Sequence, residues 1–314
     1  MSGEWQNPLP LQGWFLVTQS RALGCGAVLG IDLPNTPLVV YRTAAGVVRA
    51  VAAHCPHMGT HLRNATVEGE TLRCPLHHWQ WTADAANPPE NDIRCLAGYP
   101  VQEACDGVWI FNQSAVAENK SPGFPAVPSR KLHFRHGRPV FLRCPWQAVV
   151  ANAFDLNHFE TVHERALLGV PEIEDQGESL EFRYNSQTTG QSFPDRVMRK
   201  LSGNRIEVTI RCWHGSVLMI QTKTQQRETF LWLNFLPVDG GTLVKPIYAV
   251  TCGGLPGASA LRLRISAWLF QAFLRKDISI LDQMKFAPTV SEQEDPYFNA
   301  YLRFIKRQAA QIQP

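Results

Sequence analysis

The spacing of apolar residues in the first third of the chain is typical of short β-strands. Apolar runs such as LVVYRT and VVRAVAA are four to seven residues long. Turn-forming groups separate them, including Ala45-Gly46, Asn87-Pro88-Pro89 and Asp106-Gly107. Short runs divided by such turns favour antiparallel strands over helices. The pattern from residue 13 to residue 112 therefore predicts a small all-β domain.

Longer strands are predicted in the second half of the chain. Ile206, Val208, Ile210 and Cys212 alternate with polar residues, which is the period of a strand with one buried face. Asp239-Gly240-Gly241 is a strong hairpin signal between two apolar runs. Five segments have this character: SLEFRYNSQ, RIEVTIRCW, SVLMIQTKT, TFLWLNFLPV and TLVKPIYAV. We expect them to form one antiparallel sheet.

Two segments around these strands have helical spacing. Residues 148–163 predict one helix, and residues 258–286 predict another whose apolar face would lie on the sheet. Residues 114–130 contain three prolines and little periodicity, which is typical of a linker. The sequence therefore predicts an α+β protein with an all-β domain at 1–113, a linker at 114–130 and a helix-grip-like domain at 131–314, an antiparallel sheet covered by helices.

Composition narrows the classes of protein that this chain could represent. Apolar residues make up 45% and charged residues 18%, as in ordinary globular proteins, and the net charge of +3 is too small to predict nucleic-acid binding. The start, MSGEWQNPLPLQGWFLV, does not resemble a secretory signal. Arg262, Arg264, Gln271 and Arg275 interrupt the longest apolar stretch, so it is too short to span a bilayer. We expect a soluble cytoplasmic protein with no membrane span.

The eight cysteines are too sparse along the chain for a disulfide scaffold. Cys55 and Cys74 stand out because a histidine follows each of them at a ligand-like spacing. The other six have no such neighbour and are predicted to be small buried apolar residues: Cys25, Cys95, Cys105, Cys144, Cys212 and Cys252.

Cys55, His57, Cys74 and His77 form the first candidate site. They give Cys-x-His, then 16 residues, then Cys-x-x-His. Two thiolates and two imidazoles fit a structural zinc site, or a [2Fe–2S] cluster with both histidines on one iron. Zinc fingers usually pair like with like along the chain, whereas each loop here supplies one cysteine and one histidine. The spacing favours the cluster over zinc.

The two loops, CPHMG and CPLHHW, resemble the Rieske motif, and their β-rich surroundings resemble a Rieske domain. The resemblance implies Cys55 and Cys74 on one iron and His57 and His77 on the other. The residue at position 78 departs from the family, which usually has glycine there. We expect the His78 side chain to point away from the iron, toward solvent or a subunit interface.

Two further positions discriminate among Rieske proteins. Those of respiratory chains carry an extra cysteine in each loop, joined as a disulfide, where this chain has Thr60 and Leu76. The chain is therefore more similar to the oxygenase or ferredoxin kind, which has lower reduction potentials.

Residues 152–163, NAFDLNHFETVH, form the second candidate site. Asn152, Asp155 and His158 are three residues apart and would share a helix face. His163 follows His158 by five residues, which leaves the two rings about 140° apart on a regular helix. A shared metal therefore requires the helix to bulge or end between the histidines, as happens at many functional sites. A structural role for both histidines is the alternative.

The pattern Asn-x2-Asp-x2-His-x4-His is similar to the mononuclear-iron motif of Rieske non-haem iron oxygenases. By that resemblance, His158 and His163 are two ligands of a 2-His-1-carboxylate triad, which leaves open positions on Fe(II). The third ligand is expected downstream, in FLRKDISILDQM. The family pattern aligns Asp277 with this ligand, and Asp282 is the alternative.

The same resemblance implies catalytic roles for Asp155 and Asn152. In the family, the aspartate that matches Asp155 connects the mononuclear iron to the cluster of a neighbouring subunit through the histidine that matches His77. Asp155 would also accept a hydrogen bond from an iron-bound imidazole and so fix its tautomer. A homotrimer follows from this resemblance alone.

The resemblance implies the terminal component of an oxygenase, with a [2Fe–2S] cluster and a mononuclear Fe(II). It would use O2 and electrons from NAD(P)H, supplied by a separate reductase with or without a ferredoxin. No Gly-x-Gly-x-x-Gly opens a βαβ unit in this chain. The basic stretch RKLHFRHGR at 130–138 would dock an acidic donor, or be a solvated strand face.

The substrate is expected to be a hydrophobic small molecule, because the second half of the chain is rich in aromatic residues and ligand pockets are mainly apolar. Hydroxylation, or the related dealkylation or desaturation, is expected, with monooxygenation favoured over dioxygenation. Two other functions stay open: a Rieske electron-transfer protein without a catalytic iron, and a zinc-stabilised binding protein.

Overall fold

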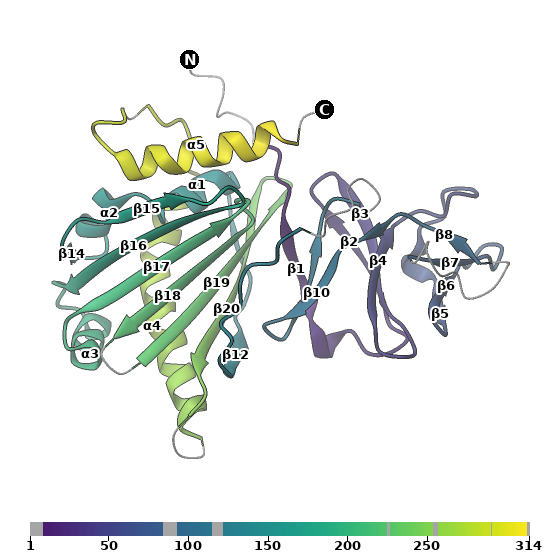
Figure 1. Ribbon diagram of the computed structural model, residues 1–314, viewed down its shortest axis with the longest axis horizontal. Coiled ribbons are helices and arrows are strands. Elements are labelled where there is room, and N and C mark those ends of the chain that lie inside the picture. Colours follow the sequence, from purple (N-terminus) through teal and green to yellow (C-terminus); the bar gives the residue numbers. More distant parts are fainter. Residues whose placement is uncertain are drawn as a thin grey trace. The chain divides into compact units, whose positions relative to one another are not determined.

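The computed structural model describes residues 9–83, 93–114, 122–224, 227–253, 257–289 and 291–312. They form two compact units (Figure 1), the N-terminal unit of residues 12–127 and the C-terminal unit of residues 128–312 with residues 9–11. The expected turn at Asn87-Pro88-Pro89 and residues 115–121 of the expected linker lie outside the described residues.

The N-terminal unit consists of three small sheets, in the orders β1-β11-β10, β2-β3-β4-β9 and β5-β6-β7-β8. All neighbours pair antiparallel except β7 and β8. The all-β character predicted from the short apolar runs is thus confirmed. The strands are β1 (Trp14–Gln19), β2 (Val28–Leu33), β3 (Thr36–Arg42), β4 (Val48–Ala52), β5 (Thr66–Glu68), β6 (Thr71–Arg73), β7 (Gln80–Thr82), β8 (Arg94–Cys95), β9 (Gly98–Tyr99), β10 (Val101–Ala104) and β11 (Gly107–Phe111), with short 3-10 turns η1 (Ser20–Ala22) and η2 (Leu62–Asn64).

In the C-terminal unit, nine strands within the described ranges form one sheet with the path β12-β20-β19-β18-β17-β16-β14. Strand β13 pairs with β20, and β15 pairs with β16. The five strands predicted from the sequence are all present, as β16 to β20. The strands are β12 (Leu132–His136), β13 (Val140–Leu142), β14 (Arg165–Leu167), β15 (Glu172–Asp175), β16 (Ser179–Thr188), β17 (Ile206–Trp213), β18 (Val217–Thr224), β19 (Arg227–Val238) and β20 (Gly241–Thr251).

Burial along these strands follows their place in the sheet. Ile206, Val208, Ile210 and Cys212 of β17 are buried while the residues between them are at least partly exposed, as the alternation predicted. The middle of β19, from Phe230 to Leu236, is buried on both faces. Its continuous apolar run is that of a central strand that is covered on both sides.

The hairpin between β19 and β20 is confirmed and explains two neighbouring glycines. Val238 pairs with Gly241, so Asp239 and Gly240 form the turn. Gly240 has a φ of 77°, a conformation that glycine adopts without steric cost. A Cβ at Gly241 would overlap the carbonyl oxygen of Leu142, so the close approach of β13 requires glycine there as well.

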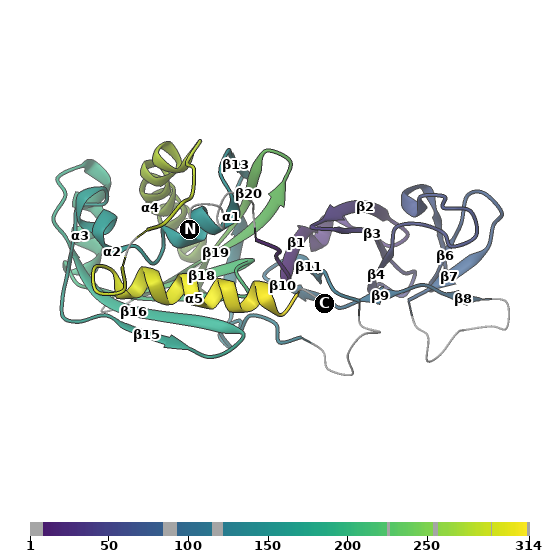
Figure 2. The ribbon, with the colours of Figure 1, turned by 90° about the horizontal axis from the view of Figure 1, so that it is seen from above.

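Five helices belong to the described part of the C-terminal unit, and Figure 2 shows them from a second direction. The helix predicted at 258–286 is present as α4, which contacts β20 and β12. The sequence analysis did not predict α5, although Asp295 caps it through the N–H of Phe298 and Pro296 is its first residue. The helices are α1 (Trp146–Ala151), α2 (Leu156–Thr161), α3 (Phe193–Ser202), α4 (Ala258–Leu281) and α5 (Pro296–Ala310).

The single helix predicted at 148–163 is wrong, because the chain forms α1 and α2 with a break between them. Asp155 has an extended backbone, and its carboxylate accepts the N–H groups of Asn157 and His158. Aspartate favours this capping position because it pairs N–H groups that otherwise lack partners. Asn152 ends α1, so Asn152 and Asp155 do not share a helix face with His158.

Within the described ranges, no helix combines the length and the apolar character that crossing a bilayer would require.

Candidate functional site

The two loops that carry the first candidate site have the same backbone hydrogen bonds. The N–H of Cys55 donates to the carbonyl of Thr60, and the N–H of Cys74 donates to the carbonyl of Trp79, at 2.9 and 2.8 Å. Each cysteine carbonyl accepts an N–H from four residues later, that of Gly59 or His78. The two loops are thus local copies of each other that present equivalent cysteines.

The backbone geometry that the two loops share explains why position 78 suits a small residue. Gly59 and His78 hold equivalent places, and both have a positive φ, of 75° and 60°. Only glycine adopts this conformation without steric cost, and other residues lose about 1 kcal/mol. The His78 side chain is exposed, in keeping with its expected direction toward solvent.

We predict that His78→Gly raises the free energy of unfolding of the N-terminal unit by about 1 kcal/mol, because glycine relieves the left-handed strain. Thermal unfolding of the cluster-loaded protein, followed by its visible absorption, measures the change. Leu76→Gly is the control, because Leu76 in the same loop has no positive φ. That change should lower stability, and a loss of stability in His78→Gly would contradict the strain.

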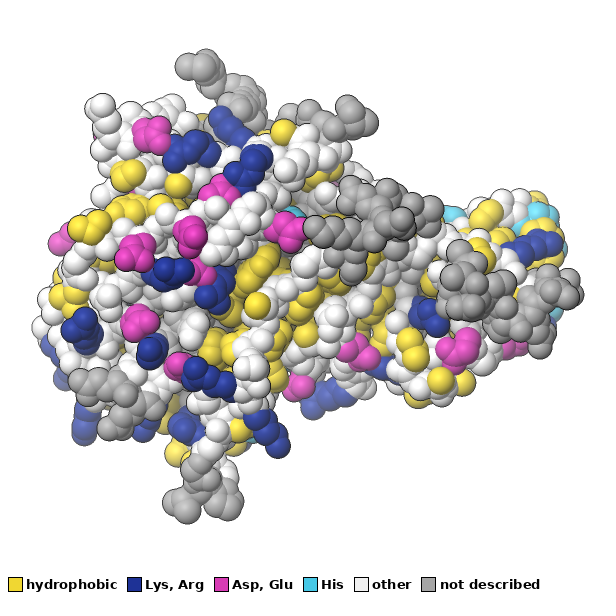
Figure 3. Space-filling view, viewed as in Figure 1, with side chains coloured by type: hydrophobic (Ala, Val, Ile, Leu, Met, Phe, Trp, Pro, Cys, Tyr) yellow, Lys and Arg dark blue, Asp and Glu magenta, His cyan; other side chains and the backbone are white. Residues whose placement is uncertain are grey.

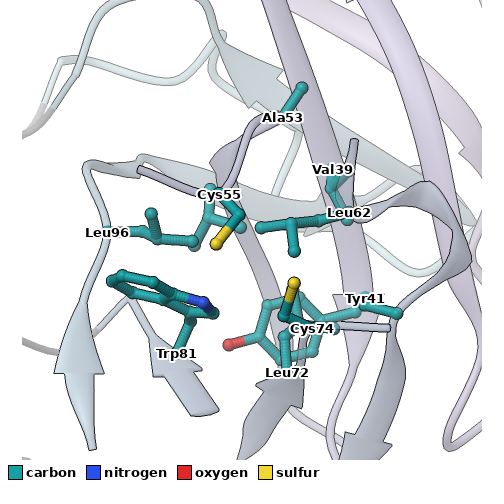
Figure 4. Close-up of a cluster of buried hydrophobic side chains, with 11 residues drawn as sticks. Val39, Tyr41, Ala53, Cys55, Leu62, Leu72, Cys74, Trp81 and Leu96 are labelled. Atoms are coloured by element: carbon teal, nitrogen blue, oxygen red, sulfur yellow. The ribbon is translucent and has the colours of Figure 1, made fainter. Parts of the chain in front are cut away.

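The two cysteines lie inside the core of the N-terminal unit. Cys55 and Cys74 are 3% and 1% exposed. The burial predicted for the other six cysteines is wrong for Cys25, Cys95 and Cys252, which are exposed. Figure 4 shows the sulfur atoms of Cys55 and Cys74 pointing into a space bounded by Leu62, Trp81 and Leu96. Burial raises the pKa of the Cys55 thiol, and the neighbouring Cys74 thiol adds to this rise. A bound cation would reverse the effect, because metal-ligating cysteine is a thiolate.

The two histidines lie at the surface of the same site. The Nδ1 atoms of His57 and His77 are 3.0 Å apart, and both side chains are exposed. Figure 3 shows histidines gathered at the end of the N-terminal unit that carries β5 to β8. Two buried sulfurs beside two exposed, converging nitrogens fit a two-iron cluster with unlike ends. The nitrogen end would be the one accessible to an electron-transfer partner.

A third feature fits a bound cluster. The indole Nε1 of Trp81 is buried and has no oxygen or nitrogen acceptor among the described residues, and its N–H interacts with the Cys55 thiol, which opposes the rise of the pKa of that thiol. Trp81 belongs to the same core cluster as the two cysteines. Buried donors in proteins are nearly always paired, and a sulfur-rich group held by Cys55 and Cys74 would offer this one an acceptor.

The sequence analysis missed a stack of three side chains beside the cluster loops. The ring of His57 stacks on that of Trp79, with centroids 4.1 Å apart and an angle of 16°. The guanidinium carbon of Arg94 lies 3.3 Å from the Trp79 centroid. One face of the indole has no room for both groups, so they occupy opposite faces. Arg94 thus adds a fixed positive charge near the nitrogen end of the site.

We predict that Arg94→Gln lowers the reduction potential of the cluster by roughly 20–40 mV, because a nearby positive charge stabilises the added electron through partly screened Coulomb attraction. A redox titration followed by EPR measures it. Arg63→Gln is the control, because Arg63 is an exposed arginine of the same unit with no ring contact among the described residues. Equal shifts of the reduction potential in the two variants would contradict the idea that the stacked Arg94 tunes the cluster.

The second candidate site joins three segments of the C-terminal unit. His158 lies on α2, His163 lies two residues after the end of α2, and Asp277 lies on α4. The Oδ1 atom of Asp277 is 2.7 Å from Nε2 of His163 and 3.8 Å from Nε2 of His158. One ligand atom from each residue lies within 4.8 Å of the others. Ligand atoms at right angles on a metal with bonds of about 2.1 Å would be about 3 Å apart, so the three residues fit a metal ion.

The end of α2 makes this convergence possible. The sequence analysis required the helix to bulge or end between His158 and His163, and α2 ends at Thr161. His163 therefore leaves the helical course and turns its ring toward His158, with centroids 5.1 Å apart. The cap at Asp155 sets where α2 begins, and this short helix sets where His158 lies.

The surroundings of His163 bury its ring and favour its neutral form. His163 is 1% exposed and stacks on Phe273, with ring centroids 3.6 Å apart. Burial lowers the pKa of His163, against the opposing effect of Asp277. Neutral imidazole is the metal-binding form. Phe273 was not predicted, although it lies four residues before Asp277 and so on the same face of α4.

Asp155 lies behind His158. Its Oδ2 is 3.7 Å from Nδ1 of His158, and this nitrogen has no hydrogen-bond partner among the described residues. Burial opposes ionisation of Asp155, but His158 and the N–H groups at the start of α2 outweigh it and hold its pKa below the usual value. Asn152 lies at the end of α1, and its predicted catalytic role stays a prediction.

Asp282 is engaged elsewhere. It accepts three hydrogen bonds from the Arg143 side chain and one from the Arg143 backbone N–H. These hydrogen bonds lower its pKa to about 2. Of the two carboxylates considered from the sequence, Asp277 is therefore the one that lies beside both histidines.

Comparison with known proteins bears on both sites. A family model described as the Rieske [2Fe-2S] domain matches residues 13–100. Cholesterol 7-desaturase of Bombyx mori is 33% identical over 178 residues, which are 54% of this chain and 38% of that protein. The oxygenase component of a probable 3-ketosteroid-9-alpha-monooxygenase of Rhodococcus rhodochrous is 28% identical over 168 residues, 48% of this chain and 41% of that protein. The matches thus span about two fifths of these relatives.

Solved structures resemble the chain over nearly its whole length. Dicamba monooxygenase bound to dicamba has a TM-score of 0.69 at 17% identity, covering 97% of this chain and 99% of that one. NdmA of Pseudomonas putida CBB5 with caffeine has a TM-score of 0.68 at 18% identity, covering 95% and 90%. At these identities the likeness shows the fold. Residues 13–100 thus form a Rieske domain, which indicates a [2Fe–2S] cluster, and the chain as a whole is similar to a desaturase and to an oxygenase component and shares the fold of the two solved structures.

Proposed function

We propose that the chain is a terminal oxygenase component that uses O2 and electrons from NAD(P)H to oxidise a hydrophobic small molecule. The observation that carries the proposal is the convergence of His158, His163 and Asp277, three residues that could hold a metal ion and that lie outside the cluster loops. A Rieske protein that only transfers electrons would not need this second site. A mononuclear Fe(II) held there would supply O2 activation.

The residues around this site have distinct roles in the proposal. His158, His163 and Asp277 would hold the metal ion, and a 2-His-1-carboxylate set of this kind suits iron that activates O2. Phe273 packs on His163 and helps to exclude water. The Asp155 carboxylate lies 3.7 Å from Nδ1 of His158. A small approach of the two groups would let it accept the Nδ1–H, which would keep Nε2 free as the ligand atom.

The electrons would enter through the other site. Cys55, Cys74, His57 and His77 would hold the cluster, and a separate reductase, with or without a ferredoxin, would reduce it. We propose a homotrimer in which the cluster of one subunit supplies the mononuclear site of the next, by way of His77 and Asp155. The support is the family resemblance, together with the exposure of His77 and the ionised state of Asp155.

The relatives favour a polycyclic hydrophobic substrate. The names of the two curated relatives refer to cholesterol and to a 3-ketosteroid, and their reactions are a desaturation and a monooxygenation. We therefore propose a sterol-like substrate, oxidised by hydroxylation or desaturation in preference to dioxygenation.

A substrate panel tests the proposal. The iron-loaded protein with a Rieske reductase and NADH would be given cholesterol, a 3-ketosteroid, dicamba and caffeine, and O2 uptake and products would be measured. We expect the steroids to stimulate O2 uptake and to yield an oxidised product. Asp277→Asn is the control for O2 consumed by the cluster alone. Failure of the whole panel with a site that contains iron would contradict the proposed substrate class.

A metal count tests the alternative of a pure electron carrier. About two iron atoms per chain with a normal Rieske EPR signal would favour the carrier, whereas about three would favour the oxygenase.

A further inference from the structure

Two helices of the C-terminal unit carry bulky apolar side chains on their outer faces. Phe193 and Leu201 of α3 are 63% and 38% exposed, and Leu261 and Trp268 of α4 are 60% and 37% exposed. The rings of Phe193 and Trp268 are in contact, with centroids 5.8 Å apart. Figures 1 and 2 both place α3 beside α4. The four side chains thus belong to one continuous surface, the α3–α4 surface.

Helix periodicity shows that cations share this surface. On α4, Arg264 and Arg275 fall three and fourteen residues after Leu261, on the exposed stripe that includes Trp268. On α3, Arg196 and Lys200 fall three and seven residues after Phe193. All four cations are exposed. Residues such as Leu263 and Ala267 form the opposite, buried face of α4.

These cations are not neutralised within the chain. Among the described residues, none of the four side chains has a hydrogen bond or an ion pair. Asp195 is the sole acidic residue within 193–202 and 258–276, and it is buried and paired with Arg165. The α3–α4 surface therefore combines exposed apolar groups with an uncompensated positive charge.

We propose that the α3–α4 surface docks on an anionic phospholipid bilayer. Interfacial helices combine Phe, Trp and Leu with Lys and Arg, because the apolar groups enter the boundary of the acyl region while the cations meet lipid phosphates. A protein partner with acidic groups alone would not require two large apolar side chains to be more than half exposed. The surface docks the protein peripherally, without any spanning segment.

The inference goes beyond the proposed function and does not depend on it. It also has a consequence for that function, because α4 carries Asp277. A hydrophobic substrate dissolved in the bilayer would then be presented close to the helix that supplies a metal ligand.

Vesicle co-sedimentation with the cluster-loaded protein tests the proposal. We expect several-fold more protein to bind vesicles of phosphatidylcholine with phosphatidylglycerol than vesicles of phosphatidylcholine alone. The charge reversals Arg196→Glu and Arg264→Glu together should lower binding about tenfold or more, because each cation contributes to attraction by the anionic surface. The pair Phe193→Ser and Leu261→Ser should lower it on both kinds of vesicle.

Matched variants keep the test specific. Phe141→Ser removes an apolar side chain that is 49% exposed on β13, and Lys285→Glu reverses an exposed cation outside the α3–α4 surface. Both should bind vesicles like the parent protein. Circular dichroism and the visible spectrum of the cluster show whether each variant is folded.

Three results would overturn the proposal. One is equal binding to the two kinds of vesicle, or binding that the surface variants leave unchanged. Another is a change of oligomeric state in Phe193→Ser with Leu261→Ser, which would make the surface an interface between copies of the chain. The third is that the parent protein does not bind vesicles but binds an acidic electron-donor protein, and that the charge-reversal variant loses this binding.

Discussion

Replacing Asp277 by alanine is expected to lower the iron content of the purified protein from about three atoms per chain to about two. Asp277 supplies the carboxylate oxygen that lies 2.7 Å from Nε2 of His163, so its loss removes one of three proposed ligands. Substrate-dependent O2 uptake should fall by more than 100-fold, since loss of an outer partner of a metal ligand alone costs about 10–100-fold. Iron analysis, with EPR of the reduced cluster, measures the effect.

The control for this prediction is Asp282→Asn. Asp282 lies five residues further along and binds Arg143, so its replacement should leave the iron content unchanged. A full iron content in Asp277→Ala would show that the carboxylate ligand is a different residue. The cluster signal should be normal in both variants, because Cys55 and Cys74 belong to the other unit.

The second large effect is expected from Asp155→Asn. The carboxylate of Asp155 is held in its charged form beside His158, and the proposed electron path runs through it. The variant should keep both metal sites, yet the reduced cluster should be reoxidised by O2 and substrate at least about 100-fold more slowly. Rapid mixing of the reduced protein with substrate and O2, followed by the visible absorption of the cluster, measures this rate.

Asparagine is chosen at position 155 because it caps a helix as well as aspartate does. The N–H groups of Asn157 and His158 therefore keep an acceptor. Asp155→Ala would also lose the helix cap, at a cost of about 1 kcal/mol in the free energy of unfolding. A slower reoxidation of the cluster in that variant could then come from lost stability or from the lost electron path. Glu160→Gln, an exposed change on the same helix, is the control. An unchanged rate of cluster reoxidation in Asp155→Asn would rule out the path through this residue.

Local patterns predicted most of the fold. The alternation in Ile206, Val208 and Ile210 identified β17, and the Asp239-Gly240 turn identified the hairpin of β19 and β20. Such signals depend only on neighbours along the chain, so the sequence contains them fully. The sequence analysis missed the break between α1 and α2 because the position of Asp155 fits the helical spacing. The Asp155 side chain, however, stabilises the start of a new helix more than the continuation of the first one.

The sequence by itself determined which chemical groups the candidate sites contain. Cys-x-His and Cys-x-x-His gave four candidate ligands of the cluster, and a metal shared by His158 and His163 required the helix to bulge or end between them. The family resemblance favoured Asp277, but spacing along the chain alone could not determine which carboxylate lies beside those histidines. Asp277 and Asp282 are five residues apart at one end of α4, and only packing turns the first toward His163 and the second toward Arg143.

The tertiary structure alone also decided the Arg94–Trp79–His57 stack and the joining of α3 to α4 through Phe193 and Trp268. The physical reason is the same in each case. Spacing along the chain fixes the direction of a side chain relative to its own helix or strand, whereas contacts across many residues, such as the 114 between His163 and Asp277, depend on how whole elements pack.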